Sequence, residues 1–81
     1  MINKKSLSVA GNLEVPSYKI LKELGYNIIK QDEIWVAEND YWTLQAKSQI
    51  ELLGLANLIE KKGDNWRVTD NEIEEFLKLS K

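Results

Sequence analysis

The residues best suited to chemistry form an acidic group near the C-terminus. Carboxylate and amide oxygens of this kind bind Ca²⁺ in loops between helices, and the chain supplies them at Asp64, Asn65, Asp70, Glu72, Glu74 and Glu75. The spacing does not fit such a loop. Counted from Asp64, the ligand positions fall on Trp66 and Val68, and Thr69 stands where a glycine must turn the chain. We therefore expect no metal and no other cofactor.

Histidine and cysteine are both absent from the 81 residues. Their absence removes the commonest general base, the thiol nucleophile and the thiolate metal ligands. An enzyme would have to depend on carboxylates, lysines, tyrosines or serines, and these residues show no catalytic spacing. We therefore predict that the protein is not an enzyme.

Positive charge is concentrated in the N-terminal third of the chain. Residues 1–30 contain five lysines and two acidic residues, whereas the remainder is acidic by five charges. The five lysines could contact phosphate groups of a nucleic acid, and they are Lys4, Lys5, Lys19, Lys22 and Lys30. The helix expected after Thr69 opens with acidic residues, which a DNA backbone would repel, so a helix-turn-helix reader is not favoured.

Alternating side chains predict a three-stranded antiparallel meander. Strands over 34–38 and 41–46, joined by Asn39 and Asp40, would pair Glu38 with Tyr41 and Ala37 with Trp42. A strand over 26–30 extends the sheet through a turn at either 31–32 or 32–33. The core face then carries Tyr26, Ile28, Trp35, Ala37, Trp42, Leu44 and Ala46.

The opposite sheet face is the strongest candidate for a binding surface. It would carry Ile29, Ile34, Val36, Tyr41 and Thr43, which is too apolar a set for a solvated face. A partner protein, a second copy or the first helix could cover it. The N-terminal tail could also do so, using Leu7, Val9, Leu13 and Val15. Trp66, in the connection between the last two helices, either plugs the core or adds to a binding surface.

Capping signals predict three helices. The first opens at Pro16 and Ser17 and ends at Gly25, and the second runs from a Ser48 cap to Gly63. The third begins with a Thr69 and Glu72 capping box. The apolar arc of the second helix is so wide that it must be covered on two sides, and Gly54 within it suggests a close approach by a neighbouring element.

Length and composition indicate one small globular domain. With 43% hydrophobic and 30% charged residues, the chain can form a core but not two. We expect a tail over 1–15, either mobile or adding an edge strand at 6–10, and a single α+β domain over 16–81 in the order α-β-β-β-α-α. Because no apolar run approaches the roughly 20 residues that cross a bilayer, we expect no membrane association and a cytoplasmic location.

These observations predict a small, non-catalytic protein-interaction module, of the inhibitor, immunity, antitoxin or phage-antagonist type. It would bind another protein, or itself as a homodimer, through the apolar sheet face. The alternative is a nucleic-acid-associated regulator that uses the basic N-terminal third. Binding through lysines would weaken steeply as salt rises, whereas an apolar interface would be far less sensitive to salt.

Overall fold

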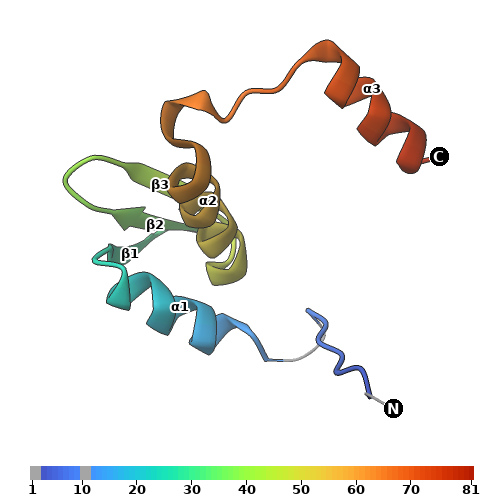
Figure 1. Cartoon of the computed structure of the whole chain (residues 1–81). Helices are drawn as coiled ribbons and strands as arrows, with labels where there is room; N and C mark the ends of the chain where they lie inside the picture. Colours follow the sequence, from blue (N-terminus) through green and yellow to red (C-terminus); the bar gives the residue numbers. More distant parts are fainter. Residues whose placement is uncertain (1–2, 10–11) are drawn as a thin grey trace.

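Helices and strands follow one another in the predicted order. The computed structural model describes residues 3–9 and 12–81. Its elements are α1 (Glu14–Glu23), β1 (Asn27–Gln31), β2 (Ile34–Glu38), β3 (Thr43–Ala46), α2 (Gln49–Lys62), the 3₁₀ turn η1 (Gly63–Asn65) and α3 (Asp70–Leu79). Figure 1 shows this α-β-β-β-α-α arrangement, which confirms the predicted α+β class.

The three strands form an antiparallel meander with β2 in the centre. Gln31 lies opposite Ile34, so the first hairpin turns at Asp32 and Glu33. This is one of the two turns that the sequence allowed. Asp32 has a φ of 55°, and aspartate tolerates this left-handed conformation better than most residues because its short side chain can hydrogen-bond locally.

The predicted register between β2 and β3 is wrong by two residues. Glu38 lies opposite Thr43 and Ala37 opposite Leu44, so the connection is a loop of four residues, 39–42. The Asn39 side chain explains this longer loop, because its Oδ1 accepts hydrogen bonds from the backbone amides of Tyr41 at 2.9 Å and Trp42 at 2.7 Å. A shift of two preserves side-chain parity, so the predicted faces of β3 are retained.

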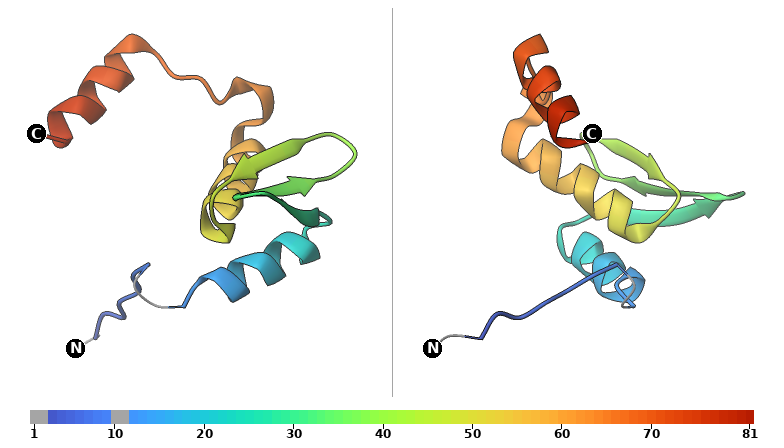
Figure 2. Two further views of the ribbon diagram at one scale, coloured as in Figure 1. Left: turned by 180° about the vertical axis from the view of Figure 1, so that it is seen from behind. Right: turned by 90° about the vertical axis from the view of Figure 1, so that its right-hand side faces the viewer.

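Helices α1 and α2 lie on one side of the sheet (Figure 2). The buried cluster joins all of these layers and contains Leu21, Ala37, Leu44, Leu52 and Ala56. Tyr26, Ile28, Trp35 and Trp42 pack against it, as predicted for the core face. Helix α2 contacts α1 as well as β2 and β3, which confirms that its apolar arc is covered on two sides.

Helix α1 begins at Glu14, ahead of the predicted start at Pro16. The Glu14 carboxylate accepts hydrogen bonds from the backbone amides of Gln49 and Ile50, at 2.9 and 3.1 Å. These two amides belong to the first turn of α2, where backbone donors have no partner within the helix. Glu14 therefore links α1 to α2, while Ser17, predicted as the cap, is buried inside the helix.

The end of α1 is fixed by a Schellman motif. The amide of Gly25 donates to the Lys22 carbonyl at 3.0 Å, and the amide of Tyr26 donates to the Leu21 carbonyl at 3.1 Å. Gly25 has a φ of 97°, which a side chain would strain. Glycine at this position therefore terminates the helix and turns the chain into β1.

Helix α3 and the N-terminal segment both extend away from the two-layer body (Figures 1 and 2). Residues 6–9 form no strand, so the expected edge strand is not present there, and Ala10 lies outside the described residues. In the part of the chain that the structure describes, no helix has both the length and the apolar character needed to cross a membrane.

Gly54 shows that the predicted close approach at α2 is wrong, since a Cβ at this position would meet no atom within 4 Å. We predict that Gly54→Ala raises the free energy of unfolding by about 0.5–1 kcal/mol, because alanine is the better helix former. Urea unfolding followed by circular dichroism measures the change.

Gly25→Ala is the matched control for this substitution. A Cβ at Gly25 also meets no atom within 4 Å, but the φ of 97° is unfavourable for alanine. We expect this variant to lose about 1–2 kcal/mol of stability. Equal effects of the two substitutions would contradict the assignment of Gly54 to an open, regular stretch of helix.

Candidate functional site

Three apolar side chains lie together on the sheet face that points away from α1 and α2. Ile29 on β1 is directly opposite Val36 on β2, and Ile34 precedes Val36 by two residues on the same strand. Side chains with these relations share a face and touch. Ile29 remains 45% exposed and Ile34 41% exposed, which is high for isoleucine.

A polar rim surrounds these side chains and completes what we call the outer sheet face. Its further members are Asn27, Gln31, Glu38, Thr43 and Gln45, which have the same strand parity. The Thr43 hydroxyl donates to the Glu38 carboxylate at 3.0 Å, tying β3 to β2 on this side. An apolar centre inside a polar rim is the usual composition of a protein interface.

Two residues predicted for this surface are placed differently by the structure. Val36 is only 6% exposed, because its neighbours on β1, β2 and β3 surround it in the central strand. Val36 is therefore part of the outer sheet face but presents little area to a partner. Tyr41 lies in the loop before β3 and is highly exposed, because the longer loop removes it from the strand.

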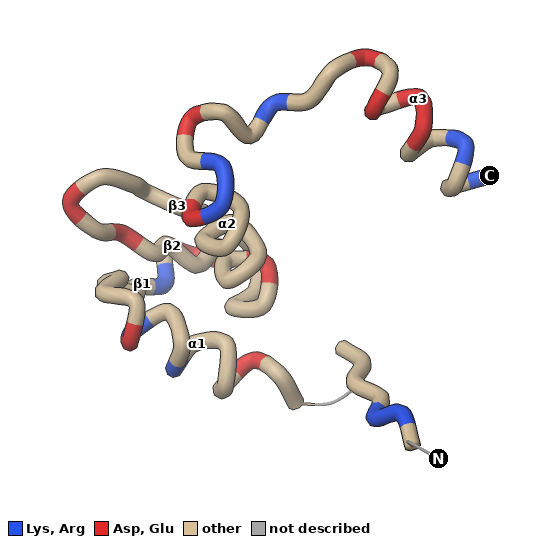
Figure 3. Tube along the Cα trace, in the orientation of Figure 1, with Lys and Arg blue, Asp and Glu red and all other residues tan. Residues whose placement is uncertain are grey.

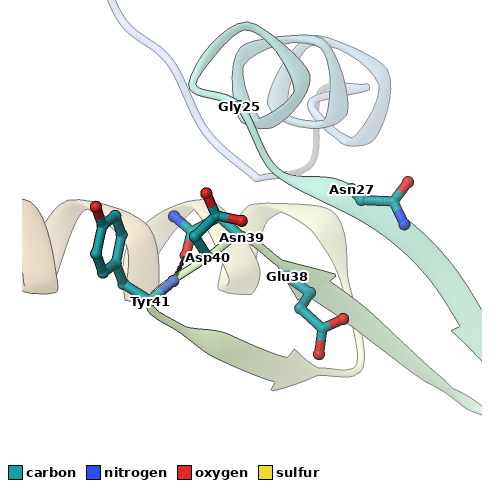
Figure 4. Close-up of a pocket in the computed structure, with 6 residues that line it drawn as sticks. All are labelled: Gly25, Asn27, Glu38, Asn39, Asp40 and Tyr41. Atoms are coloured by element: carbon teal, nitrogen blue, oxygen red, sulfur yellow. Dashed lines mark hydrogen bonds between the residues drawn. The ribbon is translucent and has the colours of Figure 1, made fainter.

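Figure 4 shows Tyr41 at one end of a polar hollow of about 390 Å³, apart from Asn27 and Glu38. The hollow is lined by Gly25, Asn27, Glu38, Asn39, Asp40 and Tyr41. The oxygen of the Asn39 side chain is committed to the loop amides. No group of three metal-ligating side chains occurs among residues 3–9 and 12–81, so this hollow is not assigned a cation.

None of the described segments covers the outer sheet face. Leu7, Val9 and Val15 are largely exposed, and Val15 lines a hollow with Ile28 and Trp35 on the helix side of the sheet. The cover by the N-terminal tail that the sequence left open is therefore not formed by the described residues. Helix α1 contributes Leu21 to the core on the opposite side. The outer sheet face is accessible.

Trp66 lies elsewhere, against the edge of the sheet formed by β3. It lines an apolar hollow of about 290 Å³, which we call the α2–β3 groove, together with Trp42, Thr43, Leu44, Gln45, Leu55, Leu58 and Ile59. Trp66 is 44% exposed, so it closes part of the core and leaves part of its ring accessible. The sequence pattern did not indicate this groove because its lining comes from three separate segments.

A second aromatic hollow lies between α1 and the first hairpin. It measures about 340 Å³ and is lined by Glu14, Val15, Tyr18, Ile28, Trp35 and Gln49. The side-chain amide of Gln49 is buried, and neither its nitrogen nor its oxygen has a hydrogen-bond partner among the described residues. An unsatisfied buried amide costs about 1–3 kcal/mol, so this position opposes stability.

The five lysines predicted to contact phosphates do not form one patch. Figure 3 shows the positive charge of the N-terminal segment apart from that of α1 and β1. Lys22 lies over the ring of Tyr18 at 5.3 Å, and Lys30 lies over the ring of Trp35 at 5.0 Å. These cation–π contacts hold two of the lysines near the aromatic hollow.

Among residues 3–9 and 12–81, two groups have shifted pKa values. Burial and the nearby Glu60 carboxylate raise the pKa of Tyr26, although a hydrogen bond with Asn39 opposes the shift. The Tyr26 phenol is therefore neutral at physiological pH. Hydrogen bonds from the Thr69 backbone and hydroxyl lower the pKa of Glu72, because they favour the charged carboxylate.

Glu72 gives α3 a predictable dependence on pH. The Thr69 amide donates to its carboxylate at 2.9 Å, and the Glu72 amide donates to the Thr69 hydroxyl at 3.3 Å, which confirms the predicted capping box. Because the folded pKa lies below the ordinary value of about 4.3, the box stabilises α3 above that pH and is lost as the pH falls through the folded pKa. We predict that α3 unwinds as the pH is lowered from 7 to 3, measured by Cα chemical shifts over Asp70–Leu79.

Glu72→Gln supplies the control, because glutamine accepts the same hydrogen bond and does not titrate. We expect the variant to show a smaller change in α3 helicity between pH 7 and 3. Identical pH profiles would show that other carboxylates govern the helix.

Comparisons with known proteins do not assign a function to this chain. The chain matches no protein-family model, and neither a curated protein nor a solved structure is significantly similar to it. A small α+β fold is compatible with many activities, so the fold alone assigns none.

Proposed function

We propose that the protein is a non-catalytic interaction module that binds another protein through the outer sheet face. The single observation that carries the proposal is the exposure of Ile29 and Ile34 on a face that none of the described segments covers. Antiparallel sheets in which only one face packs against helices normally present polar side chains on the other. Exposed isoleucines on β1 and at the start of β2, on either side of the buried Val36, are better suited to a partner than to water.

The arrangement of the face favours a protein over a small molecule. The isoleucines stand on a sheet surface with polar neighbours, whereas small molecules are usually bound in enclosed, mainly apolar pockets. Val36 lies beside them on the same face and is buried, so the apolar surface is continuous across β1 and β2. A preorganised apolar centre reduces the entropy lost on binding.

Several roles share this mode of action, including inhibitor, immunity protein, antitoxin and antagonist of a host system. Each of them needs only a stable scaffold and a complementary surface. The absence of histidine and cysteine is compatible with these roles, since they require neither proton transfer nor a nucleophile. A cytoplasmic location remains part of the proposal.

Nucleic-acid binding is the alternative, and one observation favours it. Lys22 and Lys30 lie beside the aromatic hollow that contains Tyr18 and Trp35, and a combination of positive charge and aromatic rings suits stacked bases. The overall charge of −2 and the separation of the lysines in Figure 3 oppose it. We therefore favour a protein partner.

The test compares three immobilised proteins as bait for partners from the source cells. We predict that Ile29→Lys combined with Ile34→Lys lowers partner retention at least tenfold relative to the unmodified protein, because two charged groups would be buried in the interface. Leu7→Lys with Val9→Lys is the matched control, since it makes the same change at exposed apolar residues of the N-terminal segment.

Replacing the two isoleucines with lysines is expected to have opposite effects on protein binding and on nucleic-acid binding. Added lysines weaken an apolar protein interface, but they preserve or strengthen binding to nucleic acid. Equal retention by all three baits would contradict the proposed surface. Retention of nucleic acid that collapses between low and high salt would support the alternative.

A further inference from the structure

Helix α3 has an amphipathic surface that the rest of the described chain leaves uncovered. Ile73, Phe76 and Leu77 lie on one side of the helix at spacings of three and four residues, and we call this side the α3 apolar face. Phe76 is 66% exposed, and no residue of α3 is buried. A helix of 10 residues is marginally stable alone in water, so α3 needs a packing partner.

The chain exposes enough surface to form a dimer. A compact monomer of 9.4 kDa exposes roughly 5,000 Å², whereas this chain exposes 7306 Å². Its radius of gyration is 15.5 Å, compared with about 12 Å for a compact domain of this length. A stable interface buries about 800 Å² per partner, so the excess is larger than a dimer requires. The N-terminal segment accounts for part of this excess and α3 for another part.

The α2–β3 groove has the chemistry to receive this helix. Leu58 on α2 is 41% exposed, and Trp42 and Trp66 present aromatic surface beside it. The groove also runs along β3, an edge strand whose backbone groups a docked helix would shield. An apolar helix face and an apolar groove of this kind are a common recognition pair.

Charge fixes the orientation of the helix in the groove. The acidic residues of α3 lie in its first six positions, and Lys78 follows near its end. Helix α2 has Glu51 in its first turn, and its last turn contains Lys61 and Lys62 with one acidic residue, Glu60, and so carries a net positive charge. Figure 3 shows these positive and negative segments. Because both helices run from acidic to basic, opposite charges meet when α3 lies antiparallel to α2.

The connection favours a groove on a second molecule. Residues 66–69 contain no glycine or proline, and two of the four, Val68 and Thr69, are β-branched and favour an extended backbone. Thr69 has a φ of −81° and a ψ of 163°, as an extended helix cap requires. Figures 1 and 2 show that the chain runs outward from α2 to α3 along this connection. The connection therefore carries α3 away from its own groove.

We propose that two copies of this chain exchange α3, so that the α3 apolar face of each copy packs antiparallel to α2 in the α2–β3 groove of the other. The exchange produces a symmetric dimer in which the same two surfaces are used by both copies. The outer sheet face shares only Thr43 and Gln45 of β3 with this groove, so its apolar residues on β1 and β2 remain free for another protein. The dimer and the proposed function can therefore succeed or fail separately.

Light scattering with size-exclusion chromatography gives the first test. We expect the unmodified protein to have twice the 9.4 kDa mass of the chain, and both Phe76→Glu and Leu58→Glu to have the mass of one chain. Asn71→Glu is the matched control, because it adds the same charge on the opposite side of α3 and should leave the dimer intact. Circular dichroism verifies that each variant folds.

Cross-linking identifies the exchanged contact, and the absence of natural cysteine makes it selective. Leu58→Cys and Phe76→Cys are prepared as separate proteins, mixed and treated with a short bis-maleimide. We expect a covalent heterodimer that Asn71→Cys, in place of Phe76→Cys, does not form.

Three outcomes would overturn the exchange. The unmodified protein could be a monomer at all concentrations, or the dimer could persist in both glutamate variants. A double variant that carries Leu58→Cys and Phe76→Cys in one chain could instead link within that chain at high dilution, which would show that α3 returns to its own groove.

Discussion

The packing of α2 against two layers is the interaction on which the rest of the structure depends. One side of this helix places Leu52 and Ala56 against the sheet residues Ala37 and Leu44, and Leu21 of α1 joins the same buried cluster. Hydrogen bonds from the first turn of α2 to Glu14 link the starts of the two helices. Because α1 and α2 share one side of a three-stranded sheet, the other side is left without a helix.

Three apolar surfaces of the described residues remain exposed after this core has formed, and they differ in their chemistry. The outer sheet face is a mixed surface with two exposed isoleucines beside the buried Val36, which suits reversible binding of another protein. The α2–β3 groove and the α3 apolar face are both apolar and have complementary charge order, which suits a permanent interface. A protein with 81 residues can therefore combine a dimer interface with a separate recognition surface.

Structural features that depend on residues close together in the sequence were predicted correctly. Features that depend on residues far apart in the sequence were missed. The Thr69 capping box and the alternation of Ile28 and Ile29 involve near neighbours, and both predictions are confirmed. The start of α1 at Glu14 was missed because the amides that stabilise it lie 35 and 36 residues away. The register of β3 was missed because one Asn39 side chain lengthens the loop, although parity kept the faces correct.

The candidate binding surfaces also contain some residues that the sequence could assign and some that it could not. Ile29 and Ile34 could be assigned to the outer sheet face from alternation alone, whereas the burial of Val36 depends on side chains from neighbouring strands. The α2–β3 groove could not be predicted because β3, α2 and Trp66 meet only after folding.

The central claim is that apolar surface that is not buried in the core of one chain is covered by other molecules. Amide hydrogen exchange at several protein concentrations tests this claim. We predict that α3 amides around Phe76 gain protection as the concentration rises, while those of β2 stay unchanged. Protection of α3 that is the same at every concentration would contradict this claim.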